Sequence, residues 1–429
     1  MKDSRNKGFY IAMGLAFLAV IWMVATTQFR DDFFTEPSRM FNFGGRIFGT
    51  LGMALFALNF VFTARWRFME KLTGPLDQQY RSHHMVGGLT LIFLLIHPLL
   101  MSFQYAAFSW DQAAMSFFDF SDWRLALGTI ALVLLLGLLS ITFYARWKYE
   151  NWRLSHQWLG LPFFLGGIHA IVISLNPFLI AYTLLGGAAL FWRTILKLYR
   201  KTEYMFSVEA VHAVTDRINE LVLKPATIMP KFFPGQFAFV HVQAPGMKGQ
   251  PHPFSITSDP TEDRLRFSIK NLGDFTSQIP TLRPGTTVRV EGPFGGFSYI
   301  EAESKKQIWI AGGIGITPFL AMARHLDRMN NTDYDIDLYY TVNNESEAAF
   351  FPEFRDVAAR KSNFTFHPHF SNALGFLTAD MVVSNNSDLK DTEIFLCGPA
   401  SFMKSLKDQF KTKGVPESKI HYEQFSLQD

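Results

Sequence analysis

The chain has 429 residues, a net charge of +3 at pH 7 and an apolar content of 48%. The small positive excess is accounted for by loops beside apolar segments, so composition and charge exclude a nucleic-acid partner. The single cysteine, Cys397, excludes an intrachain disulfide and any cysteine-held metal cluster. The apolar residues are concentrated before about residue 200, which indicates a membrane part followed by a globular part.

Six apolar segments in the first part are long enough to cross a bilayer. They cover residues 9–27, 46–64, 85–105, 124–145, 156–175 and 178–197, and each is near the length of about 20 residues that a membrane helix needs. The first also has the basic start and apolar run of a signal peptide, whose removal would leave the orientation of the others unchanged. We therefore expect a six-helix transmembrane bundle.

The charges of the loops predict the orientation of this bundle. The basic residues that fall on one side are Lys2, Arg5, Lys7, Arg65, Arg67, Lys71, Arg81, Arg146, Lys148, Arg153, Arg193, Lys197, Arg200 and Lys201. The opposite loops are neutral, aromatic or acidic, with Asp31, Asp32, Glu36, Asp111 and Asp119. Basic loops face the cytoplasm. We expect a multi-pass plasma-membrane protein whose two termini are both cytoplasmic.

Four histidines lie in or beside these apolar segments, in two pairs. His83 and His97 are 14 residues apart, and His156 and His169 are 13 apart. Fourteen residues are close to four helical turns, so the first pair shares one helix face at depths that differ by about 21 Å. Imidazole is a common iron ligand, and ionisable groups in a membrane need a functional reason. We predict that the four side chains bind two stacked hemes, one near each side of the membrane.

Two alternatives qualify this assignment. His84 lies 13 residues before His97 and could replace His83, and a lone membrane histidine more often forms an interhelical hydrogen bond than binds a metal. Thirteen residues also fall about 140° short of a common helix face. Pro162 and the glycines around it could kink the second helix and correct the phase.

After Lys201 the pattern changes to short alternating strands. Phe237–Val242 and Leu265–Ile269 are examples, and Pro-Gly pairs at 234–235 and 284–285 mark turns, which is typical of an antiparallel barrel to about residue 303. From Gln307 onward strands alternate with helices. The segments Gln307–Ala311, Ile336–Thr341, Phe364–Phe370 and Glu393–Cys397 predict a parallel sheet.

A glycine-rich turn follows the first of these strands. The segment from Ile308 to Pro318 reads Ile-Trp-Ile-Ala-Gly-Gly-Ile-Gly-Ile-Thr-Pro, and such a turn brings backbone amides to a pyrophosphate at a helix start. An ordinary tight turn is the alternative. A tight turn without a ligand is less favoured, because a Cys-Gly-Pro segment ends a later strand at the same sheet edge, where open α/β sheets bind ligands. The predicted nicotinamide-binding residues here are Gly312, Gly313, Gly315, Thr317, Pro318, Cys397, Gly398 and Pro399.

The barrel carries a second motif, His-Pro-Phe-Ser-Ile-Thr at residues 252–257. An aromatic ring beside a hydroxyl suits a flavin, with Phe254 packing on the ring system and Ser255 reaching its N5 edge; alone, Phe254 could be an ordinary core residue. A later strand runs through Gly273 into an expected helix start suited to the flavin pyrophosphate. The predicted flavin-binding residues are His252, Pro253, Phe254, Ser255, Thr257, Lys270, Gly273 and Thr276.

Together these motifs resemble the ferric reductase and NADPH oxidase superfamily, as a bacterial oxidase-like member, over nearly the whole chain. The histidine spacing resembles the oxidase branch, and the His-Pro-Phe-Ser, Ala-Gly-Gly-Ile-Gly-Ile-Thr-Pro and Leu-Cys-Gly-Pro segments resemble its FAD and nicotinamide motifs. The resemblance implies a multidomain membrane protein with a six-helix heme bundle at 1–202. An antiparallel β-barrel FAD domain at 203–304 and an α/β parallel-sheet NAD(P)H domain at 305–429 would follow.

The family implies that NAD(P)H gives a hydride to FAD, which passes single electrons through an inner and an outer heme b to an acceptor outside. By position, Phe425 resembles the family's terminal aromatic that covers the flavin, with Glu423 as its polar neighbour; burial of a last strand is the alternative. Phe163 or Phe164 resembles the aromatic bridge between the hemes, or faces lipid. We expect the reacting groups near the flavin to be Ser255, Cys397 and Phe425.

The chain departs from the family at two places. Met101 stands where superoxide-producing relatives carry a second histidine beyond the outer ligand, although Arg46 could supply a positive charge near the outer heme or simply snorkel to the interface. Ser371 and Asn372 stand where NADPH-selective relatives carry Ser-Arg. Ser371 could bond a 2'-phosphate, but the clamping guanidinium is missing, so we expect both nicotinamides to be used.

The leading functional hypothesis is a transmembrane NAD(P)H oxidase that forms superoxide from O2 and needs no obligatory protein partner. A ferric-chelate reductase is the first alternative. A module that delivers electrons to an extracytoplasmic protein or quinone, through the aromatic loop at 103–123, is the second. A histidine-lined proton channel is the last, since it leaves the flavin and nicotinamide motifs unused.

Overall fold

The structure is a computed structural model of the chain. It describes residues 6–28, 36–64, 66–106, 108–118, 120–145, 149–194, 203–248, 251–329, 333–384, 389 and 391–423. The chain divides into two compact units near residue 200, close to the boundary that the change in sequence pattern predicts.

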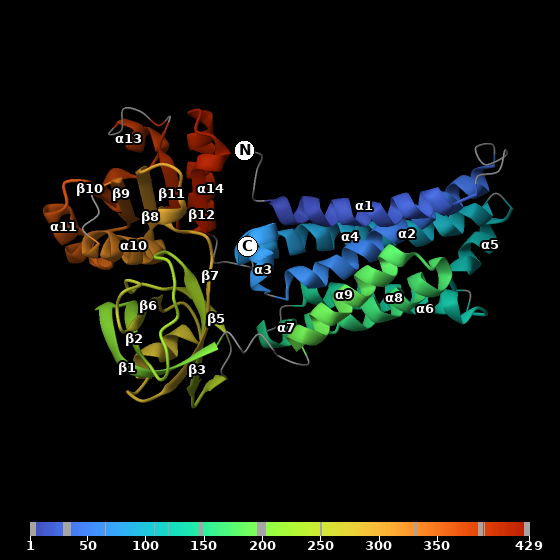
Figure 1. Cartoon of the computed structure of the whole chain (residues 1–429), viewed down its shortest axis with the longest axis horizontal. Coiled ribbons are helices and arrows are strands. Elements are labelled where there is room, and N and C mark those ends of the chain that lie inside the picture. Colours follow the sequence, from blue (N-terminus) through green and yellow to red (C-terminus); the bar gives the residue numbers. More distant parts are fainter. Residues whose placement is uncertain are drawn as a thin grey trace. The chain divides into compact units, whose positions relative to one another are not determined.

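The first unit is a bundle of helices that run side by side (Figure 1). They are α1 (Lys7–Thr26), α2 (Pro37–Phe62), α3 (Arg67–Thr73), α4 (Leu76–Ala106), α5 (Trp110–Met115), α6 (Trp123–Tyr144), α7 (Tyr149–Gln157), α8 (Gly160–Ser174) and α9 (Pro177–Thr194), with the 3₁₀ helix η2 (Ser116–Phe118). Local signals set the helix starts. Pro37 occupies the first turn of α2, and the Asp122 carboxylate caps α6 by accepting a hydrogen bond of 2.9 Å from the Arg124 amide.

Five of the described helical stretches are long and apolar enough to cross a membrane. They are Lys7–Thr26, Pro37–Phe62, Gln78–Ala106, Trp123–Tyr144 and Asn151–Ser174, and they correspond to the first five expected spans. The sixth expected span contains α9, which has 18 described residues and is not among the five.

The fifth expected span is interrupted between its two histidines. His156 lies in α7 and His169 in α8, and Trp158 and Leu159 form a turn between these helices. The Leu159 amide donates to the carbonyl of His156, three residues earlier, at 3.2 Å, which closes a tighter turn than the four-residue spacing of an α-helix. The helix is therefore interrupted between the two histidines, before Pro162.

The second unit begins with an antiparallel sheet. Its strands are β1 (Glu203–Thr215), β2 (Ile218–Pro225), β3 (Phe237–Ala244), β4 (Met247–Lys248), β5 (His252–Ser255), β6 (Leu265–Lys270) and β7 (Thr287–Phe294). The 3₁₀ helix η4 (Thr276–Thr281) lies between β6 and β7, and the 3₁₀ helix η5 (Tyr299–Glu301) follows β7. The strand order is β4-β3-β7-β1-β2-β6, and β5 pairs with β3. An isolated bridge between Ile256 and Phe267 connects the segment after β5 to β6.

A parallel sheet follows. Its strands are β8 (Lys306–Gly312), β9 (Asp335–Val342), β10 (Phe364–Phe370), β11 (Glu393–Cys397) and β12 (Ile420–Glu423), in the order β10-β9-β8-β11-β12. The helices are α10 (Thr317–Arg328), α11 (Phe351–Arg360), α12 (Ser371–Leu374), α13 (Ala379–Ser384) and α14 (Ala400–Thr412), with η6 (Gly313–Ile316), η7 (Glu345–Glu347) and η8 (Glu417–Lys419). The four expected strands are confirmed, while β12 was not among them. The central β8 and β11 place their carboxyl ends together, where open α/β sheets bind ligands.

Candidate functional site

The bundle brings the four predicted histidines together in two pairs. The ring centres of His83 and His156 are 5.9 Å apart, and those of His97 and His169 are 6.3 Å apart. Two imidazoles that ligate one metal ion from opposite sides, with metal–nitrogen bonds of about 2.0 Å, hold their centres about 6 Å apart. Both separations therefore fit axial ligation of one iron by each pair.

Among the described residues, no group of three or more side chains is arranged to hold a bare metal ion. A pair of imidazoles fills only the two axial positions of an iron, so a macrocycle has to supply the other ligands. The histidine pairs therefore fit heme better than a free metal.

The positions of the two rings favour His83 over His84 as the partner of His156. His83 is half-buried and faces His156, whereas the His84 side chain is exposed. His156 also stacks on Trp152, with ring centres 5.2 Å apart and an interplanar angle of 9°. His83 is therefore the better partner of His156.

Backbone carbonyls orient three of the four rings. His97 Nδ1 lies 2.8 Å from the Gly45 carbonyl oxygen, and His169 Nδ1 lies 2.7 Å from that of Arg124. His83 Nδ1 has a longer contact of 3.3 Å to the Asn59 carbonyl. A carbonyl only accepts, so each Nδ1 carries the proton and Nε2 is left as the ligating nitrogen.

Phe163 lies inside the bundle, midway in sequence between His156 and His169. Its ring is fully buried and packs on Phe60 and Phe56 of α2, with ring centres 4.7 and 5.5 Å away. Phe164 has 46% of its surface exposed. Of the two candidates for an aromatic bridge, Phe163 is therefore the one in the interior.

A pocket of about 360 Å³ opens where α1 and α4 end and α2 begins. Its lining residues are Thr27, Gln28, Ser38, Arg39, Asn42, Phe43, Arg46, Gln104, Tyr105 and Phe108. Arg39 is paired with Glu36 at 2.5 Å, and the Asn42 amide donates to Gln104 at 2.8 Å. Arg46 follows Gly45, whose carbonyl holds His97, so this polar and cationic pocket lies toward the His97 end of the bundle.

Met101 takes the place next to Gly45 on the adjoining helix. A Cβ added at Gly45 would lie 2.8 Å from the Met101 sulfur. The methionine therefore packs closely beside Gly45, whose carbonyl contacts His97.

In the second unit, the flavin motif forms β5 and the residues after it. His252 stacks on Phe275, with ring centres 3.8 Å apart, and Phe254 is nearly parallel to Phe275 at 6.2 Å. Burial, and secondarily the charge of His241, lowers the pKa of His252 from 6.5 to about 4. His252 is therefore a neutral, flat ring at neutral pH, suited to an aromatic ligand.

The other predicted flavin residues have mixed positions. The side chains of Ser255 and Thr257 are buried, while Lys270 is half-buried at the end of β6. The expected helix start after Gly273 is a six-residue 3₁₀ helix, η4. The Thr276 hydroxyl oxygen already accepts the amides of Leu272 and Gly273 at 2.8 and 2.9 Å. A phosphate at this turn would have to replace those bonds.

The two glycine turns of the nucleotide motif pack against each other. A Cβ at Gly315 would lie 2.3 Å from the Cys397 carbonyl oxygen, and a Cβ at Gly398 would lie 3.1 Å from Gly312 Cα. Gly313 has a φ of +54°, and no other group comes within 4 Å of its would-be Cβ. Its backbone is therefore open to a ligand at the start of α10, where free amides favour a pyrophosphate. Thr317 and Pro318 are buried in the first turn of α10, and Pro399 immediately precedes α14.

Cys397 and Glu423 lie side by side at the ends of β11 and β12, where they are paired in register. Both are buried, and burial, reinforced by the Glu423 charge, raises the pKa of the Cys397 thiol. A Cβ at Gly295, just after β7, would lie 2.8 Å from the Glu423 carboxylate, so the end of β12 returns to the antiparallel sheet. Phe425 lies outside the described residues.

Ser371 lies directly after β10 at the same edge of the parallel sheet. Its hydroxyl donates to the Val342 carbonyl at 3.3 Å and lies 3.4 Å from the Asn343 side-chain oxygen. Ser371 therefore lies at the sheet edge that carries the two glycine turns.

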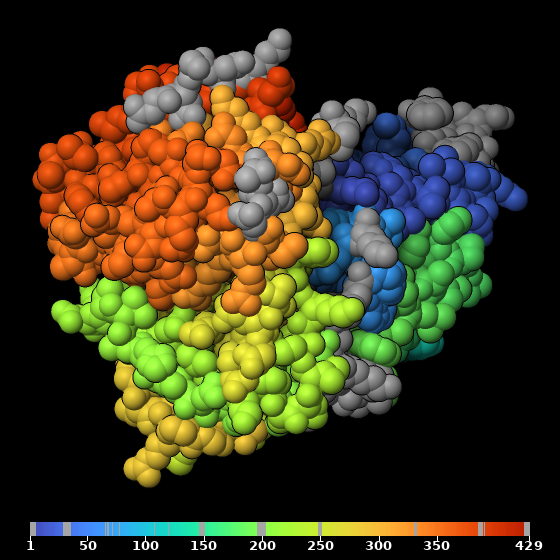
Figure 2. Space-filling model, turned by 60° about the vertical axis from the view of Figure 1, so that its left-hand side comes forward, coloured from blue at the N-terminus to red at the C-terminus, as the bar shows by residue number. Residues whose placement is uncertain are grey.

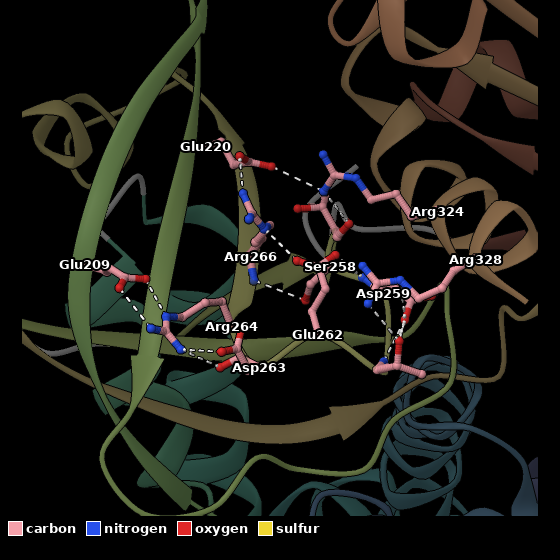
Figure 3. Close-up of polar contacts among 12 residues, drawn as sticks. Glu209, Glu220, Ser258, Asp259, Glu262, Asp263, Arg264, Arg266, Arg324 and Arg328 are labelled. Carbon is pink, nitrogen blue, oxygen red and sulfur yellow. Dashed lines mark hydrogen bonds and ion pairs between the residues drawn. The ribbon is translucent and has the colours of Figure 1, made fainter. Parts of the chain in front are cut away.

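A network of ion pairs joins the two sheets of the second unit (Figure 3). Arg324 of α10 donates to Glu220 of β2 at 3.3 Å and to the Thr257 carbonyl at 2.8 Å. Arg266 of β6 donates to the same Glu220 at 3.1 Å. In Figure 2 the green-to-yellow sheet and the orange-to-red sheet domain meet over a continuous surface. Arg324 therefore couples the helix after the nucleotide turn to the flavin motif.

Sequence reasoning missed three features of this site. Phe275 stacks on the flavin motif, and the only signal for it is an aromatic residue after a turn glycine. Arg324 is the central cation of the network, but a helical arginine carries no signal of its own. The two glycines beside the histidines, Gly49 and Gly128, need the packing of neighbouring helices to be seen.

Comparisons with known proteins agree with this organisation. Residues 48–167 match the family of ferric-reductase-like transmembrane components, residues 203–298 an FAD-binding domain family, and residues 309–408 the oxidoreductase NAD-binding domain family. The first match lies within the helical bundle, the second covers the antiparallel sheet, and the third lies within the region of the parallel sheet.

Similar curated proteins include the reductase component of propane 2-monooxygenase from Rhodococcus jostii, 25% identical over 51% of this chain, and a flavohemoprotein from Rhodopirellula baltica, 26% identical over 48%. The chain spans 62% and 57% of their lengths. Among solved structures, a flavohemoglobin from Malassezia yamatoensis is 20% identical and has a TM-score of 0.49, and the match covers 79% of this chain and 97% of the flavohemoglobin chain. The FAD/NAD-binding domain of a nitric oxide dioxygenase from Vibrio cholerae is 24% identical and has a TM-score of 0.45, and the match covers 51% of this chain and 97% of that domain.

The fold and these matches define an NAD(P)H-dependent flavin oxidoreductase with a ferric-reductase-like transmembrane domain. The chain has the domain architecture of the ferric reductase and NADPH oxidase superfamily.

Proposed function

We propose that the chain is a transmembrane NAD(P)H oxidase that takes electrons from cytosolic NAD(P)H, by way of FAD and two b-type hemes, and gives them to extracytoplasmic O2 to form superoxide. The observation that carries the proposal is the pairing of His83 with His156 and of His97 with His169 inside a bundle that is joined to a flavin reductase. A reductase that served only soluble partners would have no use for two such pairs.

The histidine pairs fit heme on two grounds. Their ring separations of 5.9 and 6.3 Å match two axial imidazoles on one iron. The carbonyls of Gly45 and Arg124 hold the outer rings in the tautomer that leaves Nε2 for the metal. We assign His83 and His156 to the inner heme, and His97 and His169 to the outer one.

The reductase unit fits FAD and a nicotinamide nucleotide. His252, Phe254 and Phe275 present flat rings for the flavin, and the open backbone at Gly313 receives the nucleotide pyrophosphate. FAD, when bound, converts a hydride into single electrons, and the hemes offer single-electron sites across the bundle. The buried, protonated Cys397 and its neighbour Glu423 shape a water-poor edge where the nicotinamide would meet the flavin. Phe425, two residues beyond Glu423, would cover that edge.

The orientation of the bundle follows from its charges. Lys7, Arg81, Arg153 and Arg193 lie at one end, which we assign to the cytoplasm together with both termini. At the opposite end, Arg39 and Arg124 are each paired with a carboxylate, Glu36 and Asp122. The net excess of positive charge is therefore at the end that carries His83 and His156.

Purified full-length protein tests the proposal. We expect NAD(P)H to drive cytochrome c reduction in air without added protein, and superoxide dismutase to suppress it. Electron transfer that persists under air but is insensitive to dismutase would contradict superoxide as the product.

A second function, reduction of an anionic ferric chelate, is favoured by the pocket that Arg39 and Arg46 line with amide and hydroxyl groups. Arginine recognises carboxylates well, and ferric carboxylate chelates carry them. Anaerobic reduction of ferric citrate that exceeds the aerobic rate of superoxide formation, and that Arg46→Gln weakens by raising KM, would favour this function.

A further inference from the structure

The outer histidines, His97 and His169, are held by the same arrangement on two different helices. Each Nδ1 contacts a backbone carbonyl, at Gly45 on α2 and at Arg124 on α6, at 2.8 and 2.7 Å. In both helices the residue four positions after that carbonyl is a glycine, Gly49 and Gly128. The two helices are distant in sequence, since α2 precedes His97 and α6 lies between His97 and His169.

Both glycines are in direct contact with the imidazoles. A Cβ at Gly49 would lie 2.7 Å from His97 Nδ1 and 3.0 Å from its Cε1. A Cβ at Gly128 would lie 2.8 Å from His169 Cε1 and 2.9 Å from its Nδ1. Real Cβ atoms do not approach so closely, and the obstructed atoms belong to rings that are fixed by their own hydrogen bonds.

Helix geometry explains the spacing. The carbonyl of residue i points along the axis toward residue i+4, whose amide occupies one of its two lone pairs. A side chain at i+4 stands beside that carbonyl, and only a glycine there leaves the second lone pair open to a ring from a neighbouring helix. The glycine thus exposes the acceptor and makes room for the imidazole at once.

We propose that Gly49 and Gly128 are positioning residues for the two outer heme ligands. Each opens the carbonyl one turn earlier, and that carbonyl fixes the histidine as the Nδ1-protonated tautomer with Nε2 toward the iron. This inference rests on the proposed function, because it takes the histidine pair to be a heme site.

The inner pair lacks this arrangement. His83 Nδ1 is 3.3 Å from the Asn59 carbonyl, and the residue four positions later is Thr63. His156 Nδ1 has no hydrogen-bond partner among the described residues, and its ring rests on Trp152. A donated Nδ1 proton makes imidazole a more basic ligand and favours oxidised iron. The glycines therefore act on the outer heme alone and hold its reduction potential down.

The chain supplies matched controls for helix packing. A Cβ at Gly52 of α2 would lie 2.7 Å from Leu94, as close as at Gly49, but it would touch no histidine. Gly137 of α6 has no other group within 4 Å of its would-be Cβ. Gly52→Ala thus reproduces the steric conflict without involving a histidine, and Gly137→Ala replaces a glycine without creating a steric conflict.

The experiment compares purified full-length Gly49→Ala, Gly128→Ala, Gly52→Ala and Gly137→Ala with the unsubstituted protein. The readouts are heme per chain, the low-spin signals of oxidised iron in electron paramagnetic resonance, and the midpoint potential of each heme, with bound flavin as the folding check. We expect Gly49→Ala and Gly128→Ala to weaken the outer heme about 10- to 100-fold, as loss of a ligand's supporting contact does. Any outer heme that remains should have a shifted signal and a raised potential, while the inner heme is unchanged.

The outcomes separate the alternatives. Two hemes with unaltered signals and potentials in Gly49→Ala and Gly128→Ala would overturn the proposal, and so would the same loss in Gly52→Ala. If the single variants do not fold, Gly49→Ala is placed in a His97→Ala background. In that background Gly49→Ala should cause no further loss of inner heme and no further decrease in melting temperature. A decrease as large as in the single variant would overturn the proposal. Absence of heme from the unsubstituted protein is a separate result that refutes the proposed function itself.

Discussion

Arg324 of α10 donates a hydrogen bond of 2.8 Å to the carbonyl of Thr257, the last residue of the flavin motif. The same guanidinium pairs with Glu353 of α11 at 2.6 Å and reaches Glu220 of β2. One side chain thus ties the helix that follows the nucleotide turn to the strand region that carries the flavin motif (Figure 3). We therefore expect Arg324 to set the position of the proposed nucleotide site relative to the proposed flavin site.

Arg324→Ala should slow the reduction of bound flavin by NADPH by about 10- to 100-fold, because hydride transfer is sensitive to misplacement of about 1 Å. The measurement is anaerobic stopped-flow absorbance of the full chain, with flavin content as the check on folding. Arg328→Ala is the control, since Arg328 lies on the same helix but is exposed, and its contacts are a hydrogen bond of 3.1 Å to the Thr261 hydroxyl and a 3.9 Å approach to Asp259. An equal slowing in both variants would show that Arg324 has no special positioning role.

The reductase unit should become less stable as the pH is lowered, and His252 is one cause. The folded protein keeps this ring neutral, with a pKa of about 4, because of burial and the nearby His241, whereas the unfolded chain takes up a proton near pH 6.5. Between these values the unfolded state binds more protons, so the free energy of unfolding decreases as the pH falls.

Melting temperatures of the full chain between pH 4 and pH 8 test this dependence. His252→Phe keeps a flat ring on Phe275 without the titration, so its melting temperature should fall less steeply below about pH 6.5. Equal slopes for the two proteins would mean that other groups control the pH dependence.

Phe163 should matter more than Phe164 to the bundle. Phe163 is fully buried against Phe56 and Phe60, and truncation of a buried phenylalanine costs about 3–5 kcal/mol. Phe163→Ala should therefore lower the melting temperature and slow electron arrival at the outer heme, and Phe164→Ala should do neither. The reverse order would place the bridging aromatic on the other side of α8.

Both nicotinamides should support turnover, because Ser371 offers a hydroxyl but Asn372 offers no guanidinium to a 2'-phosphate. Asn372→Arg should raise the preference for NADPH over NADH by about tenfold or more, as a charge-assisted hydrogen bond allows. The test is kcat/KM for each nucleotide. A preference above about a hundredfold for either nucleotide in the unsubstituted protein would contradict the expectation.

The sequence predicts those parts of the molecule whose signals are local. The strand Phe364–Phe370 and the meeting of Gly312 with Cys397-Gly398 follow from apolar runs and turn residues, and both are found as expected. The break at Trp158 and Leu159 was not predicted, because an apolar run has the same pattern whether its helix is continuous or interrupted.

The site residues that were missed depend on contacts between distant segments. Gly49 and Gly128 look like ordinary membrane glycines until His97 and His169 are seen beside them. Arg324 meets Thr257 across 67 positions of the chain, and no local pattern encodes that distance. The histidine spacing was informative because two hemes stacked across a membrane would need their ligands at two matched depths on both helices.

The most direct test of the account is heme and flavin content of the purified chain and of five variants, His83→Ala, His84→Ala, His97→Ala, His156→Ala and His169→Ala. We expect two hemes and one flavin in the unsubstituted protein and in His84→Ala, and loss of one heme with retained flavin in each of the other four. Protein from heme-replete cells that shows no heme absorbance, or variants of His83, His97, His156 and His169 that keep both hemes, would contradict the account.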